Sequence, residues 1–72
     1  MNKIKANSSN IEYFWYDKEK EILSVEFKVG KVYEYLNVPE KIFNEMRVAE
    51  SKGKFLNKHI KDVFRFVKKE EI

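Results

Sequence analysis

Hydrophobic and polar residues alternate over the first half of the chain, in three segments rich in aromatic and β-branched side chains. These segments run over residues 11–16, 22–27 and 32–36. A hydrophobic period of two is typical of β-strands. Because the connections between the segments are short, the pattern predicts a three-stranded antiparallel meander.

The second turn of this meander decides which face the tyrosines Tyr33 and Tyr35 occupy. A two-residue loop would place Glu34 on the apolar face. A three-residue loop that ends at Gly30, with the glycine in the left-handed conformation, pairs Val25 with Tyr33 and keeps the apolar face continuous. A shift by one residue would turn over every side chain. We therefore expect a positive φ at Gly30 and both tyrosines on the helix-covered face.

The hydrophobic period changes to that of a helix after Pro39, a residue that suits the first turn of a helix. The apolar residues Ile42, Phe43, Met46 and Ala49 share one face of a helix expected over residues 39–51. Gly53 is expected to end or break it.

A second helix is expected from about Lys54 to Asp62. Its inward residues would be Leu56, Ile60 and Val63. Residues 63–67 alternate like a strand, but they could equally extend this helix by another turn.

These elements predict an α+β fold in which the three-stranded meander is followed by two helices packed on one face, with a short C-terminal strand as one option. In the core, Phe43, Met46, Leu56 and Ile60 should cover Val25 and Phe27, with Phe55 or Phe64 closing one end. The expected organisation is a flexible N-terminal arm (1–10), one domain (11–67) and a charged tail (68–72).

The composition excludes several classes of protein. With 72 residues, the chain has room for one core. It has no cysteine, so disulfides and thiolate metal sites are excluded. No apolar run approaches the ~18 residues of a membrane span, and no hydrophobic stretch follows the N-terminal lysines as in a signal peptide. We expect a cytoplasmic protein without membrane contact.

Positive charge is concentrated at the C-terminal end, where residues 52–72 hold seven Lys/Arg and three Asp/Glu. Lys54, Lys58 and Lys61 follow helical spacing, Arg65 could extend their stripe, and Asn57 adds a hydrogen-bonding group. Such a stripe can bind phosphates. It can equally be the solvated face of an amphipathic helix, and Asn57 can be a structural tie to a loop.

Tyr13 and Trp15 alternate with core-side residues and should stand on the outer face of the sheet. There they could stack on bases or anchor a protein partner. A third reading is that the C-terminal segment covers them.

Catalytic and metal chemistry find little support in the residues. His59 is the only histidine, and a metal site would need partners that the chain does not supply. The two glycines, Gly30 and Gly53, cannot form a phosphate-cradling loop. We expect no catalytic residue, no metal and no cofactor.

A series of short motifs resembles the KTSC family, small domains named for the C-terminus of certain lysyl-tRNA synthetases. The motifs are Ser8-Ser9, Tyr16-Asp17, Tyr33-Glu34-Tyr35, Val38-Pro39, Ala49-Glu50-Ser51-Lys52-Gly53, Phe55 and Asn57-Lys58-His59-Ile60-Lys61. They span residues 8 to about 66. The chain departs from the family pattern at Trp15, Val29, Phe64 and Phe66. The resemblance implies that Tyr33, Tyr35 and Gly53 are structural, and it suggests RNA binding by association with the synthetases.

Two hypotheses for a non-catalytic binding module follow. The first is RNA or DNA binding through the lysine stripe. The second is a protein-interaction module that uses Tyr13 and Trp15 to dock onto a larger protein or a second copy. The oligomeric state stays open.

Overall fold

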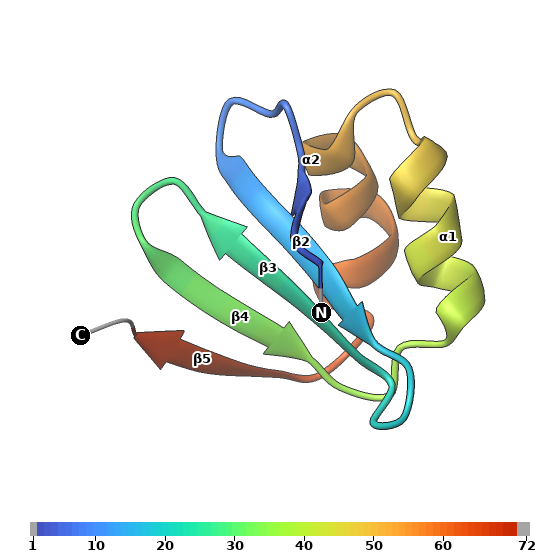
Figure 1. Cartoon of the computed structure of the whole chain (residues 1–72). Coiled ribbons are helices and arrows are strands. Elements are labelled where there is room, and N and C mark those ends of the chain that lie inside the picture. Colours follow the sequence, from blue (N-terminus) through green and yellow to red (C-terminus); the bar gives the residue numbers. More distant parts are fainter. Residues whose placement is uncertain (1, 71–72) are drawn as a thin grey trace.

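The protein is a five-stranded antiparallel sheet with two helical segments on one face (Figure 1). The computed structural model describes residues 2–70. The strands neighbour one another in chain order: β1 (Ile4–Lys5), β2 (Ile11–Asp17), β3 (Ile22–Phe27), β4 (Lys31–Tyr35) and β5 (Phe66–Glu70). Between β4 and β5 lie α1 (Glu40–Val48), α2 (Lys52–Phe55) and the π-helical segment η1 (Leu56–Ile60). The predicted α+β meander with two following helices is confirmed, including the C-terminal strand.

The β3–β4 hairpin has the predicted register. Gly30 has a φ of 91°, and its amide donates a hydrogen bond to the carbonyl oxygen of Phe27 over 2.8 Å. Val25 is paired with Tyr33, and Tyr35, on the same face, is only 3% exposed. Both tyrosines therefore lie on the helix-covered side, as expected.

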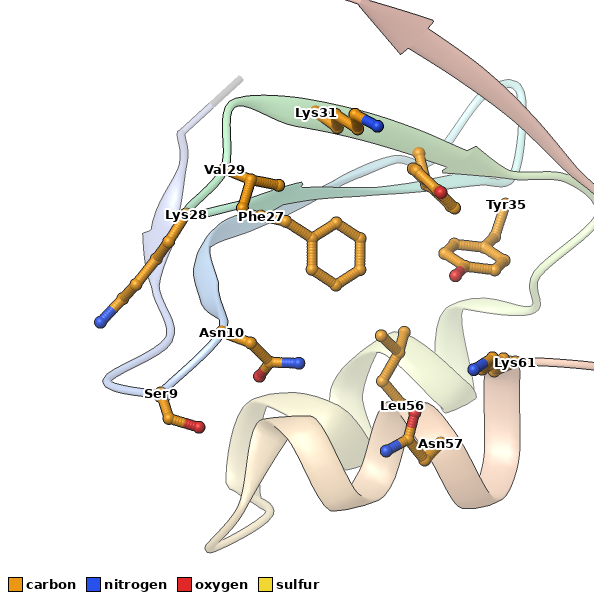
Figure 2. A pocket seen from close by; sticks show the side chains of 11 residues that line it. Ser9, Asn10, Phe27, Lys28, Val29, Lys31, Tyr35, Leu56, Asn57 and Lys61 are labelled. Atoms are coloured by element: carbon orange, nitrogen blue, oxygen red, sulfur yellow. The ribbon is translucent and has the colours of Figure 1, made fainter.

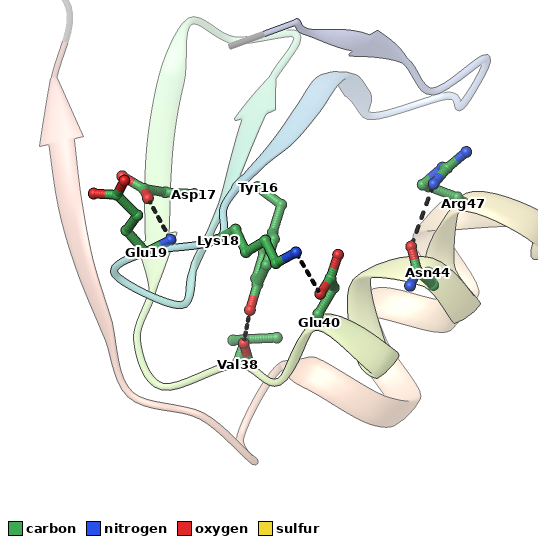
Figure 3. A network of polar contacts seen from close by, with 8 residues as sticks. All are labelled: Tyr16, Asp17, Lys18, Glu19, Val38, Glu40, Asn44 and Arg47. Atoms are coloured by element: carbon green, nitrogen blue, oxygen red, sulfur yellow. Dashed lines mark hydrogen bonds and ion pairs between the residues drawn. The ribbon is translucent and has the colours of Figure 1, made fainter.

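The start of α1 is tied to the end of β2. The Tyr16 hydroxyl donates a hydrogen bond to the carbonyl oxygen of Val38 over 2.6 Å, and Lys18 pairs with Glu40 over 3.9 Å (Figure 3). Pro39 precedes the helix with a φ of −63°, the angle that its ring imposes. The predicted helix start at this proline is confirmed.

The end of α1 differs from the prediction. The helix stops at Val48 because Ala49 is extended, with a φ of −69° and a ψ of 140°. Gly53 does not end this helix; it lies in the first turn of α2. A Cβ there would stand 3.3 Å from Asn10 Oδ1 and 3.4 Å from Ser8 Oγ, so glycine admits the N-terminal loop close to the helix.

The second helix runs through α2 and η1, beginning and ending earlier than the predicted 54–62. It closes with a wide turn, in which the amide of Lys61 donates to the carbonyl oxygen of Leu56 over 2.7 Å. Asp62 then takes a φ of 67° and turns the chain away. Val63, predicted to point inward, is 61% exposed because the helix has already ended.

Both ends of the chain contribute strands to the sheet. Ile4 and Lys5 pair with β2, and Ala6 is buried, so this part of the N-terminus is packed against the domain rather than forming the loose arm that the sequence predicted. β5 resolves the ambiguous segment as a strand from Phe66 and continues through Glu70 into the predicted tail. Met1 and residues 71–72 lie outside the described part of the chain.

The core lies between the helices and the sheet. Met46, Leu56 and Ile60 are buried with Val25, as predicted. Phe27 and Phe43 are half-buried against this core, as are Phe55 and Phe64. Phe14 is the largest fully buried side chain. No helix within residues 2–70 combines the length and the apolar character that crossing a membrane requires.

We expect Phe14→Ala to destabilise the domain by about 3–5 kcal/mol, because it removes a buried ring and leaves a cavity. A single core of this size supplies roughly 3–5 kcal/mol in total. The variant should therefore be largely unfolded at 37 °C by circular dichroism. Val29→Ala, at a side chain that is 80% exposed, is the control and should melt with the wild type. A cooperative Phe14→Ala transition within a few degrees of wild type would contradict this account of the core.

Candidate functional site

An open groove separates the β3–β4 hairpin from the second helix (Figure 2). Its volume is about 390 Å³. We call it the aromatic groove, and its lining residues are Ser9, Asn10, Phe27, Lys28, Val29, Lys31, Tyr33, Tyr35, Leu56, Asn57 and Lys61. It brings together two residues of the predicted lysine-stripe set, Asn57 and Lys61, with the tyrosine pair of the sheet.

The aromatic side chains form a connected set along the sheet. The rings of Phe27 and Tyr33 meet edge to face with centroids 5.3 Å apart, and Tyr33 stacks on Phe66 at 4.9 Å with an interplanar angle of 10°. Phe66 is paired with Tyr35 across β4 and β5 and is 51% exposed. The aromatic surface therefore continues from the groove onto β5, where Lys68 is paired with Tyr33 on the same face.

The charged residues of the groove all carry the same sign. Lys28, Lys31 and Lys61 are exposed and come from the hairpin and from the end of the second helix. No aspartate or glutamate is among the lining residues within the described part of the chain. Three ammonium groups around an aromatic cavity favour a ligand that combines an anionic group with a flat apolar one.

The Tyr35 hydroxyl lies in the groove, where Figure 2 shows it pointing away from the sheet. Burial of the side chain is the main cause that raises the pKa of Tyr35 above its usual value, and Tyr33 and Asp62 raise it further. The hydroxyl therefore keeps its proton throughout the physiological pH range and can donate a hydrogen bond into the cavity.

The predicted lysine stripe is divided in two by the structure. Lys54 and Lys58 are exposed beside a shallow hollow lined by Phe55 and His59, whereas Lys61 belongs to the aromatic groove. The wide turn of η1 changes the spacing, so the three lysines do not follow a single α-helical stripe.

Two further cations of this region differ in their contacts: the ammonium group of Lys52 has a structural role, whereas the hydrogen bond of Arg65 involves only its backbone. Lys52 donates to the carbonyl oxygens of Arg47 and Ala49 over 3.0 and 2.5 Å, which satisfies the C-terminal end of α1. Arg65 has an exposed side chain, and its carbonyl oxygen accepts a hydrogen bond from the amide of Leu36 over 2.8 Å.

Tyr13 and Trp15 lie on the predicted outer face, opposite the side that holds Phe14. Both are half-buried, and the ammonium group of Lys3 lies 5.8 and 4.9 Å from the Tyr13 and Trp15 ring centroids. The C-terminal segment, as far as Glu70, does not cover these two rings. It forms β5, which lies at the other edge of the sheet from β1 and β2.

His59 is exposed on η1, with its ring 4.7 Å from that of Phe55. Within residues 2–70 no three His, Cys, Asp or Glu side chains gather closely enough to hold a metal ion.

Sequence reasoning missed the contribution of the hairpin to this site. Phe27 was expected in the core, and Lys28 and Lys31 were not among the predicted binding residues, although all three line the groove. One signal was available: the register that places Tyr33 on the helix-covered side also places Phe27 there. The approach of the hairpin to η1, however, is not visible in the pattern.

The chain is similar to a known domain family and to several known proteins. The KTSC domain matches residues 7–64. A segment of the lysine–tRNA ligase of Nostoc punctiforme is 40% identical over 63 residues, but the match covers 88% of this chain and only 11% of the ligase. A protein of Tsukamurella paurometabola is 42% identical, with 86% of this chain and 92% of the relative covered.

The fold of a solved relative agrees with the one described above. The crystal structure of a KTSC domain protein from Yersinia pestis superposes with a TM-score of 0.90 at 32% identity, over 94% of this chain and 96% of that one. The predicted family resemblance is confirmed over nearly the whole chain.

The raised pKa of Tyr35 predicts weaker folding in alkaline solution. The folded protein holds this proton to a higher pH than the unfolded chain does, so the contribution to stability is present below about pH 10 and is lost as the pH rises through the folded pKa. Tyr35→Phe removes this dependence. The unfolding free energy from urea titrations should fall less between about pH 8 and about pH 11 in the variant than in the wild type. Equal losses in the two proteins would contradict the prediction.

Proposed function

This chain belongs to the KTSC domain family, and we propose that it is a non-catalytic binding module for single-stranded nucleic acid, RNA in particular. The observation that supports this most directly is the aromatic groove, where three lysines surround an aromatic cavity whose described lining holds no carboxylate. Such a groove offers separate contacts to the two chemically different parts of a nucleic acid, its phosphates and its bases.

The lysines supply the phosphate contacts. Lys28, Lys31 and Lys61 have exposed side chains, so their ammonium groups can exchange bound counterions for phosphates. Binding of this kind does not depend on sequence and weakens steeply as the salt concentration rises.

The aromatic rings supply the base contacts. Tyr33 and Phe66 are stacked nearly parallel, and half of the Phe66 surface is open to solvent. Any base can stack on such a ring, because every base has a π face. The open rings on β4 and β5 thus suit bases that are unpaired and splayed out, which duplexes do not offer.

The surface that could hold a nucleic-acid strand continues past the groove along the second helix. A neighbouring polar hollow shares Ser9, Asn10 and Asn57 with the groove and is also lined by Lys54. A bound nucleic-acid strand on this path would pass Lys31, Lys61, Asn57 and Lys54, and the last three belong to the binding residues predicted from the sequence. The other two predicted residues, Lys58 and Arg65, line neither of these hollows.

RNA is favoured over DNA by the family context. The segment of the Nostoc relative that matches this chain belongs to a protein named as a ligase of lysine and tRNA. The chain covers 11% of that protein, so its name supports an RNA ligand here without assigning the ligase activity.

The alternative, a protein-interaction module built on Tyr13 and Trp15, has weaker support. Lys3 lies over both rings and also pairs with Glu26 over 3.0 Å, so this surface is partly occupied by the chain itself. We therefore place nucleic-acid binding in the groove.

Removal of the groove lysines should weaken binding of single-stranded RNA. We expect Lys28→Ala/Lys31→Ala/Lys61→Ala to lower the affinity for a mixed-sequence, fluorescein-labelled RNA at least about tenfold at ~50 mM salt, measured by fluorescence anisotropy. The slope of log affinity against log salt should also become shallower by about 2, since each lost contact to a single strand removes roughly 0.7.

The matched control removes the same charge far from the groove, in the β2–β3 turn and on the first turn of α1. Lys18→Ala/Lys20→Ala/Lys41→Ala should stay within about twofold of wild type, because long-range attraction contributes less than direct phosphate contacts. Equal losses in the two triple variants would assign the binding to net charge alone. Absence of wild-type binding to both RNA and DNA oligomers at ~50 mM salt would refute the proposed function.

A further inference from the structure

Two polar groups reach the aromatic groove from opposite walls. Tyr35, on β4, is only 3% exposed, yet its hydroxyl makes no hydrogen bond within residues 2–70. Asn57, on η1, has a side-chain amide that likewise makes none within the described chain. Figure 2 shows the Tyr35 hydroxyl on the sheet side and the Asn57 amide on the helix side of the cavity.

The Tyr35 hydroxyl can be satisfied only from the groove. Buried polar groups in native proteins are almost always hydrogen-bonded. No fully buried side-chain polar atom of the described residues lacks a partner, so this hydroxyl keeps contact with the open cavity. Its proton is retained at neutral pH, as shown above, and it therefore presents a donor and an acceptor at the floor of the groove.

The space between these two groups is shaped for a flat molecule. Phe27 and Tyr33 on the sheet side and Leu56 on the helix side provide apolar surface, and the volume of about 390 Å³ lies within the range of small-ligand pockets. A nucleobase has a flat apolar face and an edge of donors and acceptors. The asparagine amide matches such an edge, because it can donate and accept at once.

We propose that the aromatic groove binds one unpaired nucleobase, an inference that rests on the proposed function. Its face packs against Phe27 and Leu56, and its edge is hydrogen-bonded by the Tyr35 hydroxyl and the Asn57 amide. The phosphate of the same nucleotide lies at the mouth, among the groove lysines. A free nucleotide and a base within a strand share this chemistry, and the experiment separates them.

The first measurement uses fluorescence anisotropy to compare affinities for four homopolymeric RNA octamers, each built from a single type of base, with the affinity for an abasic ribose-phosphate octamer of equal charge. Wild type should prefer at least one of the base-containing octamers about tenfold or more, as expected for a stacked base. Tyr35→Phe and Asn57→Ala should each reduce this preference about threefold to tenfold, the effect of one lost hydrogen bond. The salt dependence should stay unchanged, because the lysines remain.

The control is Tyr13→Phe, which removes the same hydroxyl from the outer face and should keep the wild-type preference. If all octamers bind wild type equally, with the abasic one included, the base site is refuted while the proposed function stands. If no octamer binds, the proposed function itself fails.

The second measurement follows aromatic side chains by NMR while nucleoside monophosphates or octamers are added. Signals of Phe27, Tyr33 and Tyr35 should shift, and those of Trp15, on the other face, should not. Shifts with monophosphates identify a free nucleotide as a sufficient ligand, and shifts with octamers alone assign the base to a strand. Shifts confined to Trp15 would move the base to the outer face and overturn the proposal.

Discussion

The register of the β3–β4 hairpin is the constraint on which both the core and the aromatic groove depend. The turn needs a left-handed residue, and Gly30, with a φ of 91°, provides it at little steric cost. Val25 then pairs with Tyr33, so the tyrosines share a face with the core. A slip by one residue would turn this face outward and bring Glu34 under the helices. One glycine thus fixes which side chains can meet the second helix at all.

The end of the second helix completes the site from the opposite side. A regular α-helical turn would continue the spacing of Leu56 and Ile60 toward Val63. The wide turn that joins the amide of Lys61 to the carbonyl oxygen of Leu56, followed by the positive φ of Asp62, ends the helix instead. The chain is then free to return as β5, and Lys61 is left at the rim of the groove. Local backbone geometry therefore links the strand order of the sheet to the position of a candidate phosphate contact.

The elements that depend on local pattern could be predicted from the sequence. Alternation gave the meander, and the requirement for a continuous apolar face selected the turn at Gly30. The end of α1 could not be read in the same way, because Ala49 carries no signal for an extended conformation. The strand at Ile4–Lys5 is too short for alternation to reveal it. Only part of the groove could be predicted. The helical pattern indicates that Asn57 and Lys61 lie on the second helix, but their approach to Phe27 depends on packing between segments that are distant in the sequence.

The open aromatic rings on β4 and β5 are costly for so small a domain, and this cost argues for a role beyond folding. A single core of this size leaves little stability in reserve, and each square ångström of apolar surface left in water forgoes about 25 cal/mol. Yet Phe66 remains half exposed beside a half-buried Tyr33. Their stacking recovers part of the loss. The second helix leaves these rings uncovered: η1 ends at Ile60, and Lys28, Lys31 and Lys61 line the neighbouring cavity. Departures from what folding alone favours tend to occur at functional sites. Here the unpaired Tyr35 hydroxyl and three lysines line one groove, and the exposed Phe66 ring lies next to it, stacked on Tyr33.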